Sequence, residues 1–147
     1  MNDANRDAIK KLAQLGTTLD TLADVLVKVV FDPGLQGEDV AGTKFSRSDV
    51  PGTLFDFAAH QQFFSLRYVH ALDKGELSGH IGLCRQRADG SLGDVILMMA
   101  LRQGGNLEMP DGDKLDLHNL QKSDFATIRR QFYFQLLGAV QASLIKS

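Results

Sequence analysis

A long stretch of regularly spaced apolar positions opens the chain and predicts one amphipathic helix over residues 3–31. Apolar residues recur there at intervals of three and four, which is the period of a helix that buries one face. Pro33 disfavours helical geometry at the residue before it, and the glycine that follows permits a turn, so we expect the helix to end there. The stripe consists of Ile9, Leu12, Gly16, Leu19, Ala23, Leu26 and Val30.

Residues 32–52 break every periodic pattern, because glycine and proline are frequent in them. A loop of this length is uncommon inside a compact domain and is usually functional or disordered. We favour a mobile connector over a binding loop anchored by Phe45. The next stretch, residues 53–62, is interpreted as a short helix that Thr53 caps.

From residue 63 onward the apolar period falls to two, which is the period of β-strands. The short glycine-containing turns between the apolar runs join antiparallel neighbours and leave no room for crossover helices. We therefore predict an antiparallel meander of four to five strands. Residues 95–101 are apolar at every position, so we expect both faces of that central strand to be buried. The predicted strands occupy residues 63–72, 76–87, 92–103, 106–109 and 114–118.

The last predicted element is a helix over residues 123–146, which Ser123 or Asn119 caps. Its apolar residues cover much of its circumference, so we expect it to pack on the sheet and to contact something else as well. The whole pattern predicts a single α+β domain over residues 1–147. In order, it has a long N-terminal helix, a short second helix, the antiparallel meander and the C-terminal helix.

The composition is that of an ordinary globular protein: the 147 residues are 44% hydrophobic and 23% charged, with a formal net charge of −2. A sequence pI near 6.0 indicates that the basic surface typical of nucleic-acid binding is missing, so we expect no nucleic-acid partner. The sequence has no apolar run of membrane-spanning length, no secretory signal and a single cysteine. We therefore expect a cytoplasmic protein with no membrane partner.

Two ligand-binding motifs are incomplete. Residues 37–44 resemble a phosphate-binding loop, but a threonine separates Lys44 from the second glycine, where the lysine should follow directly. Residues 111–116 resemble a calcium loop, but Leu115 and Asp116 stand where an oxygen ligand and a glycine are needed. We therefore predict no metal site and no cofactor.

Four residues with reactive side chains are expected on one face of the sheet. If residues 73–75 form a three-residue turn, Tyr68 opposes His80, and His70 and Cys84 share their face because side chains repeat every two residues. A cysteine beside a histidine can begin a nucleophilic site. However, His80 and Cys84 would lie roughly 13 Å apart along the strand. We favour an inert, buried cysteine and keep Tyr68, His70, His80 and Cys84 as an alternative pocket.

Arginines gather on the other face predicted for the sheet. With a two-residue turn at residues 89–90, Arg85 opposes Asp94 in a cross-strand ion pair worth at most ~1 kcal/mol. The other arginines suit a bound anion or a solvated surface. Apolar residues share this face, and arginine and methionine are enriched in interface cores, so we favour a protein partner there. The arginines are Arg67, Arg85, Arg87 and Arg102.

Together these patterns favour a small intracellular protein-interaction module, such as a chaperone, an adaptor or an immunity-type inhibitor. No catalytic spacing is complete, so a non-catalytic protein is favoured over an enzyme. Both terminal helices carry surplus apolar surface, which predicts a homodimer through the N-terminal or the C-terminal helix. In the first case Leu19 and Leu26 are expected at the contact. The alternative is a small-molecule-binding or hydrolytic protein whose pocket lies between the sheet and the helices.

Overall fold

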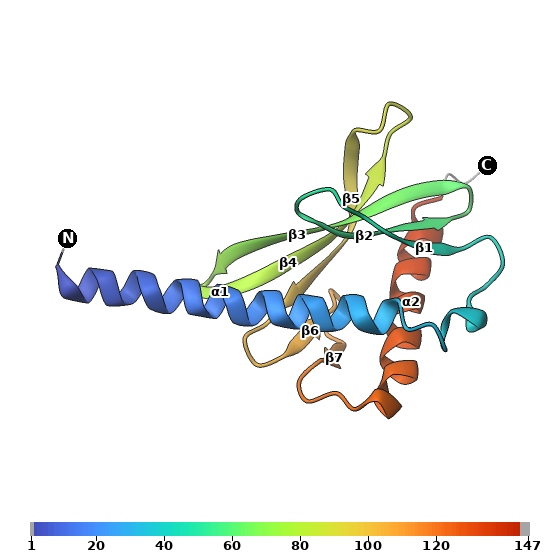
Figure 1. Cartoon of the computed structure of the whole chain (residues 1–147). Helices are drawn as coiled ribbons and strands as arrows, with labels where there is room; N and C mark the ends of the chain where they lie inside the picture. Colours follow the sequence, from blue (N-terminus) through green and yellow to red (C-terminus); the bar gives the residue numbers. More distant parts are fainter. Residues whose placement is uncertain (1, 145–147) are drawn as a thin grey trace.

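The computed structural model describes residues 2–144, and Figure 1 shows how its long helices lie against a sheet. All strands lie in one antiparallel sheet whose order follows the chain from β1 to β7. The α+β class and the meander are thus confirmed, but the sheet has seven strands and not four or five. The elements are α1 (Asp3–Val30), β1 (Lys44–Arg47), β2 (Thr53–Ala59), β3 (Gln62–Asp73), β4 (Glu76–Gln86), β5 (Leu92–Leu101), β6 (Asn106–Glu108), β7 (Lys114–Asp116) and α2 (Phe125–Ala142).

Residues 53–62 are not a helix, so the predicted short second helix is wrong. They contain strand β2 and the turn that leads into β3. Phe55 and Phe57 are buried and alternate with less buried residues, which is the period of a strand. His60 and Gln61 form the turn, and both have a positive φ, of 52° and 60°, as a tight two-residue hairpin turn requires.

Residues 32–52 also contain a strand, so they are not a plain connector. Strand β1 pairs with β2 and sets Phe45 opposite Phe57. The centres of these two rings lie 4.9 Å apart, and Phe45 is only 9% exposed. Phe45 therefore belongs to the core and does not anchor a binding loop.

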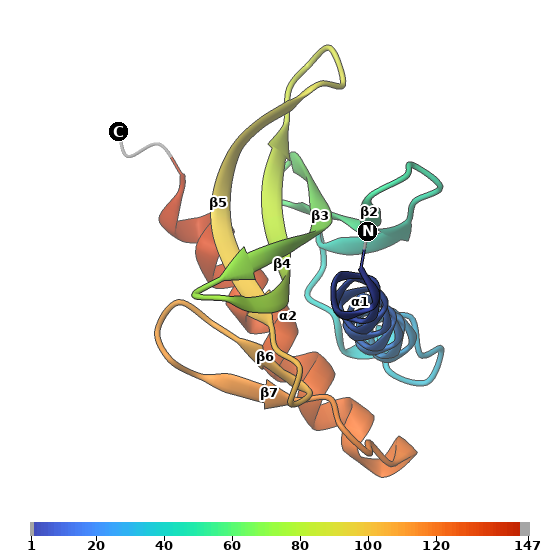
Figure 2. The same ribbon diagram turned by 90° about the vertical axis from the view of Figure 1, so that its left-hand side faces the viewer.

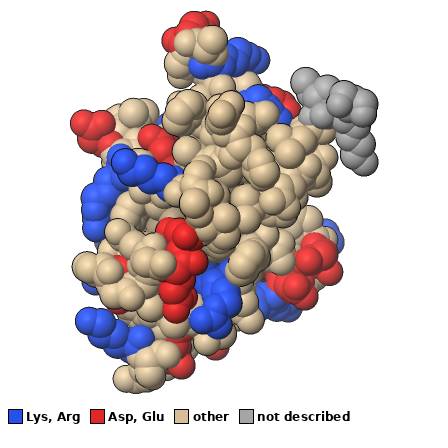
Figure 3. All heavy atoms as spheres, turned by 90° about the vertical axis from the view of Figure 1, so that its right-hand side faces the viewer, with Lys and Arg blue, Asp and Glu red and all other residues tan. Residues whose placement is uncertain are grey.

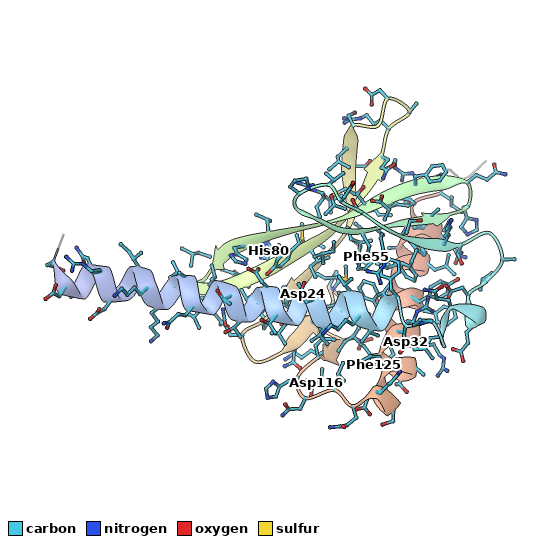
Figure 4. All side chains as sticks on the ribbon, viewed as in Figure 1. Asp24, Asp32, Phe55, His80, Asp116 and Phe125 are labelled. Carbon is cyan, nitrogen blue, oxygen red and sulfur yellow. The ribbon has the colours of Figure 1, made fainter. Side chains whose placement is uncertain are left out.

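The core lies between the curled sheet and the two helices. Figure 2 shows how the sheet curls, and α1 contacts α2 as well as several strands. Phe55 lies in the space between the strands and the helices (Figure 4). Its ring meets those of Phe31 and Phe132 edge to face, with centroid distances of 5.7 and 6.1 Å. An aromatic cluster thus joins β2 to the end of α1 and to α2.

A buried ion pair fixes the loop after α1 against α2. Arg129, in α2, is 4% exposed. Its guanidinium group donates hydrogen bonds to the carbonyl oxygen of Val30 at 2.8 Å and to the two carboxylate oxygens of Asp39 at 2.5 and 2.8 Å. A two-point contact of this kind is among the strongest hydrogen-bonded pairs in proteins. It holds the end of α1 and the loop that follows it against α2, about ninety residues later in the chain.

Two further predictions about the C-terminal half need correction. Strand β5 is not buried on both faces, because Val95 and Met98 are 47% and 46% exposed while Met99 is fully buried. Helix α2 ends at Ala142, which is earlier than the predicted end at residue 146. The predicted helical positions 145–146 lie outside the described residues.

Candidate functional site

The turn between β3 and β4 decides which side chains share a face of the sheet. Asp73 pairs with Glu76, so only Lys74 and Gly75 form the turn. Both turn residues have a positive φ, of 53° and 81°. The predicted three-residue turn is therefore wrong by one residue, and such a change of register moves every side chain of one strand to the opposite face.

As a result, the four residues predicted to line a pocket do not come together. Tyr68 pairs with Ile81 and faces α1, whereas His80 pairs with Val69 and lies on the opposite face with Cys84. The Cys84 side chain is buried, and this burial raises the pKa of its thiol despite the positive charge of Arg67. A thiol in such surroundings holds little thiolate at neutral pH and is a poor nucleophile.

Tyr68 and His70 converge instead on Asp20 of α1. The Tyr68 hydroxyl donates a hydrogen bond to Asp20 Oδ1 at 2.7 Å, and His70 Nε2 lies 2.8 Å from the same oxygen. The distance between His70 Nε2 and the Tyr68 hydroxyl is 3.1 Å. Gly16 leaves room for the imidazole, because a Cβ atom there would lie 2.8 Å from His70 Cε1. This cluster joins β3 to α1.

The geometry of the cluster suits a clamp between elements better than a catalytic centre. Burial and the hydrogen bond to Asp20 raise the pKa of Tyr68, so its phenol stays protonated and remains a donor at neutral pH. In a nucleophilic triad, an aspartate holds one histidine nitrogen while the other nitrogen activates the nucleophile. Here Asp20 and Tyr68 both meet the same nitrogen of His70.

Helix α1 projects beyond the sheet on the N-terminal side of this cluster (Figure 1). Residues 2–14 are all exposed, and we call residues 3–14 the arm. Ile9 and Leu12 of the arm are 55% and 41% exposed, although they continue the stripe that is buried farther along the helix. A hollow of about 360 Å³ runs beside them, and His70 is one of the residues that line it. The arm therefore presents an apolar edge next to an open hollow.

The residues predicted for the homodimer contact lie elsewhere on the same helix. Leu19 and Leu26 are both 0% exposed and belong to the hydrophobic core. A partner cannot reach them in this fold, so the surplus apolar surface of α1 is confined to the arm. The sequence period includes the core and arm positions in one stripe and does not distinguish between them.

The arginines predicted to bind a partner lie on both faces of the sheet, and each of them has a bonding partner within the protein. Arg67 and Arg87 donate to backbone carbonyl oxygens at 2.9 and 2.7 Å. Arg102 bonds to Asp73 at 3.0 Å, and this hydrogen bond raises the pKa of its guanidinium group. The predicted ion pair is present, with 3.4 Å between Arg85 Nε and Asp94 Oδ1. These guanidinium groups therefore have structural bonds already.

A second open surface lies on α2, the helix whose apolar circumference predicts a contact beyond the sheet. Phe134 is 56% exposed and stands between hollows of about 590 and 250 Å³. Residues 131–144 carry no charged side chain. Figure 3, which views the molecule from the right-hand side of Figure 1, shows mainly uncharged atoms over the middle of this side. The absence of charge along the end of α2 limits the predicted surplus apolar surface to this side of the helix.

Comparisons of the chain with protein-family models, with curated proteins and with solved structures find no match. No helix within residues 2–144 is long and apolar enough to cross a lipid bilayer. In the same described range, no three His, Cys, Asp or Glu side chains are grouped so that they could hold a metal ion. The arm, the cluster at its base and the surface on α2 are therefore the features from which a function can be inferred.

Proposed function

We propose that this protein is a small, non-catalytic interaction module that binds a protein partner through the arm of α1. One observation carries the proposal: the apolar stripe of α1 continues through Ile9 and Leu12 into a segment that stays exposed among residues 2–144. An amphipathic helix presented in this way is a common docking element, because a partner can bury its apolar edge. A cytoplasmic chaperone, adaptor or immunity-type inhibitor fits this description.

The arm is suited to docking because it is already helical before a partner arrives. An isolated helix of twelve residues or so is only marginally stable in water. Here the arm extends a helix whose inner part is fixed in the core, and Asn2 caps its start through a 2.8 Å hydrogen bond from the Asn5 amide. Docking therefore costs less conformational entropy than the folding of a free segment would.

The experiment compares two double variants that carry the same added charge. Ile9→Asp/Leu12→Asp places both carboxylates on the apolar edge, whereas Ala4→Asp/Gln14→Asp places them on the opposite side of the same helix. All four positions are exposed, so both variants should fold with an unchanged circular dichroism spectrum. The native mass of each purified protein and the proteins that copurify with it in stoichiometric amounts are then measured.

The wild type and the Ala4→Asp/Gln14→Asp variant are expected to retain the same stoichiometric partner. The Ile9→Asp/Leu12→Asp variant should lose it, with a fall in affinity of at least about tenfold for each buried residue. Equal retention by both variants would contradict the proposal. So would a wild-type protein that is monomeric and binds no protein at all.

A second candidate function is the binding or hydrolysis of a small molecule in the hollow beside the arm. The observation that favours it is the cluster of Asp20 and His70 at the base of that hollow. An activated ester such as p-nitrophenyl acetate serves as the probe. If His70→Gln abolishes an ester hydrolysis that the wild type catalyses, while the fold is retained, this candidate replaces the interaction module.

A further inference from the structure

The face of α1 beside the hollow has two parts of opposite character. Its outer part carries large side chains, Ile9 and Leu12, and its inner part carries small ones, Ala13 and Gly16. Leu12 and Ala13 each lie three or four residues from both Ile9 and Gly16, so all four residues lie on one side of the helix. Ile9 and Gly16 are equally far from the point between Leu12 and Ala13.

This arrangement is self-complementary for two antiparallel helices. In a pair with twofold symmetry, residues at equal distances on either side of the axis face each other, and each contact occurs twice. With the axis between Leu12 and Ala13, Leu12 of each copy meets Ala13 of the other, and Ile9 meets the His70 imidazole that covers Gly16 of the other copy. The central contact then sets a large side chain against a small one, which lets the helices approach closely.

The charged residues on this face are also arranged for antiparallel pairing, with a positive charge at the outer end and a negative charge at the inner end. Arg6 lies on the side of Ile9, in the outer part, and Asp20 lies at the inner end of the face. The Asp20 side chain is 55% exposed, and both Tyr68 and His70 bond to its Oδ1 atom. No hydrogen bond among residues 2–144 uses Asp20 Oδ2, so this oxygen is open to Arg6 of the partner subunit. Among the residues that the structure describes, the Arg6 side chain makes one ion pair, an exposed one with Asp3 of its own helix at 3.8 Å.

We infer that the partner seated on the arm is a second copy of this chain, paired antiparallel along α1 over residues 5–20. The inference rests on the proposed function and adds the identity and orientation of the partner. The paired segment is about 24 Å long at 1.5 Å per residue. Leu72 adds apolar surface to this contact, because it pairs with Leu77 at the wall of the hollow and is 64% exposed.

The test uses two single variants, one that enlarges the small residue at the centre of the pair and one that shortens the large residue. Ala13→Leu sets leucine against leucine twice in its own homodimer, and Leu12→Ala sets alanine against alanine twice. In a mixed dimer of the two variants, both contacts again join a leucine to an alanine. Ala13 and Leu12 are exposed, so neither change should disturb the fold of the single chain.

Native mass spectrometry and sedimentation velocity then report the species present. The wild type should be dimeric, and each variant alone should dissociate at least about tenfold more readily. A mixture of the two variants should form the mixed dimer with near wild-type affinity. If the wild type is dimeric but the mixture fails to recover, the antiparallel pairing about Leu12 and Ala13 is overturned.

A charge substitution tests the ends of the same pair. Arg6→Glu sets a carboxylate against Asp20 of the partner subunit and should weaken the dimer about threefold or more at low salt, with a smaller effect at high salt. Lys11→Glu makes the same charge change on the far side of the helix and serves as the matched control. Equal effects of the two substitutions would overturn the placement of Arg6 against Asp20.

The outcomes also separate this inference from the proposed function on which it rests. A monomeric wild type whose arm retains a different protein, lost on Ile9→Asp/Leu12→Asp, overturns the second copy and leaves the interaction module standing. A monomeric wild type that retains no protein overturns both. A dimer that recovers in the mixture of Ala13→Leu and Leu12→Ala supports both.

Discussion

The two halves of α1 follow one sequence pattern but meet different surroundings. In the inner half the apolar stripe packs against the sheet and α2, and Leu19 and Leu26 are completely buried. In the arm the same stripe continues through Ile9 and Leu12, which remain open to water. A helical period therefore specifies that one face is apolar, whereas the extent of the sheet decides how much of that face is covered.

The comparison implies that the inner half of α1 stabilises the fold, whereas the arm serves association with a partner. Substitutions in the inner half should act on the free energy of unfolding, because they remove buried contacts. Substitutions in the arm should leave that free energy nearly unchanged and act on association instead. The largest effects on stability are therefore expected where α1 ends against α2, and the smallest at the start of the arm.

The largest loss is expected for Asp39→Ala. This change leaves the guanidinium group of Arg129, whose side chain is 5% exposed, without its carboxylate partner. Removing one member of a buried ion pair typically costs about 3–5 kcal/mol. Urea unfolding followed by circular dichroism measures the effect. Glu38→Ala is the control, because its pair with Arg130 is more than half exposed, and it should cost about 1 kcal/mol or less.

A similar but somewhat smaller loss is expected for Leu26→Ala in the inner half of α1. A fully buried leucine that is cut back to alanine typically costs about 2–5 kcal/mol, depending on how far the cavity collapses. Leu12→Ala makes the same chemical change in the arm and should cost only about 0.5 kcal/mol. Equal losses at the two positions in monomeric protein would show that the arm is part of the core.

The elements with long repeating periods are the part of this fold that the sequence predicts well. Both terminal helices and the main strands follow from patterns that continue over many residues. Strand β2 does not, because a short apolar run such as Leu54–Ala59 fits either a helix or a strand. The sequence also predicts too few strands, because β1 lies within a stretch rich in glycine and proline.

The cluster of Asp20, Tyr68 and His70 is only partly predictable from the sequence, because it depends on a distant contact and on the length of one turn. Tyr68 and His70 follow from the strand period, but their partner Asp20 is fifty residues away in the sequence. The face shared with His80 and Cys84 depends on the length of one turn, and Lys74 adopts a positive φ that only glycine, asparagine and aspartate commonly adopt. The conformation of Lys74 shortens the turn to two residues, so Tyr68 and His70 lie on the opposite face of the sheet from His80 and Cys84.

A moderate loss is expected when the clamp at the boundary of the two halves is weakened. Tyr68→Phe removes the hydrogen bond to Asp20, which should cost about 0.5–1.5 kcal/mol near neutral pH. The pKa of Tyr68 in the folded protein lies above its ordinary value of 10.0. Above about pH 10 the unfolded chain therefore loses a proton that the folded protein keeps, and this contribution to stability falls as the pH rises.

Urea unfolding of the wild type and of Tyr68→Phe between about pH 8 and about pH 11 measures this dependence. The difference in unfolding free energy should be constant up to about pH 10 and should shrink above it. Other groups that titrate in this range affect both proteins alike, so the comparison isolates Tyr68. A difference that grows with pH would mean that the phenolate, and not the phenol, is favoured in the fold.

The smallest effect on global stability is expected at Asn2, the N-cap residue of α1. Asn2→Ala removes the side chain that accepts a hydrogen bond from the Asn5 amide, and losing such a cap costs a helix about 0.5–2 kcal/mol. Because no residue of the arm belongs to the core cluster found within residues 2–144, the arm can open locally without unfolding the domain. The global free energy of unfolding should change by less than about 0.5 kcal/mol.

Hydrogen exchange resolves this local effect along α1. In monomeric protein, Asn2→Ala should speed exchange of the amides in residues 6–12 and leave those in residues 19–26 unchanged. At concentrations where the arms pair, exchange in residues 6–12 should slow in both proteins, because opening the arm then also requires dissociation. Faster exchange in residues 19–26 would contradict the division of α1 into two halves. Exchange in the arm that is independent of concentration would leave the division intact and remove the second copy as its partner.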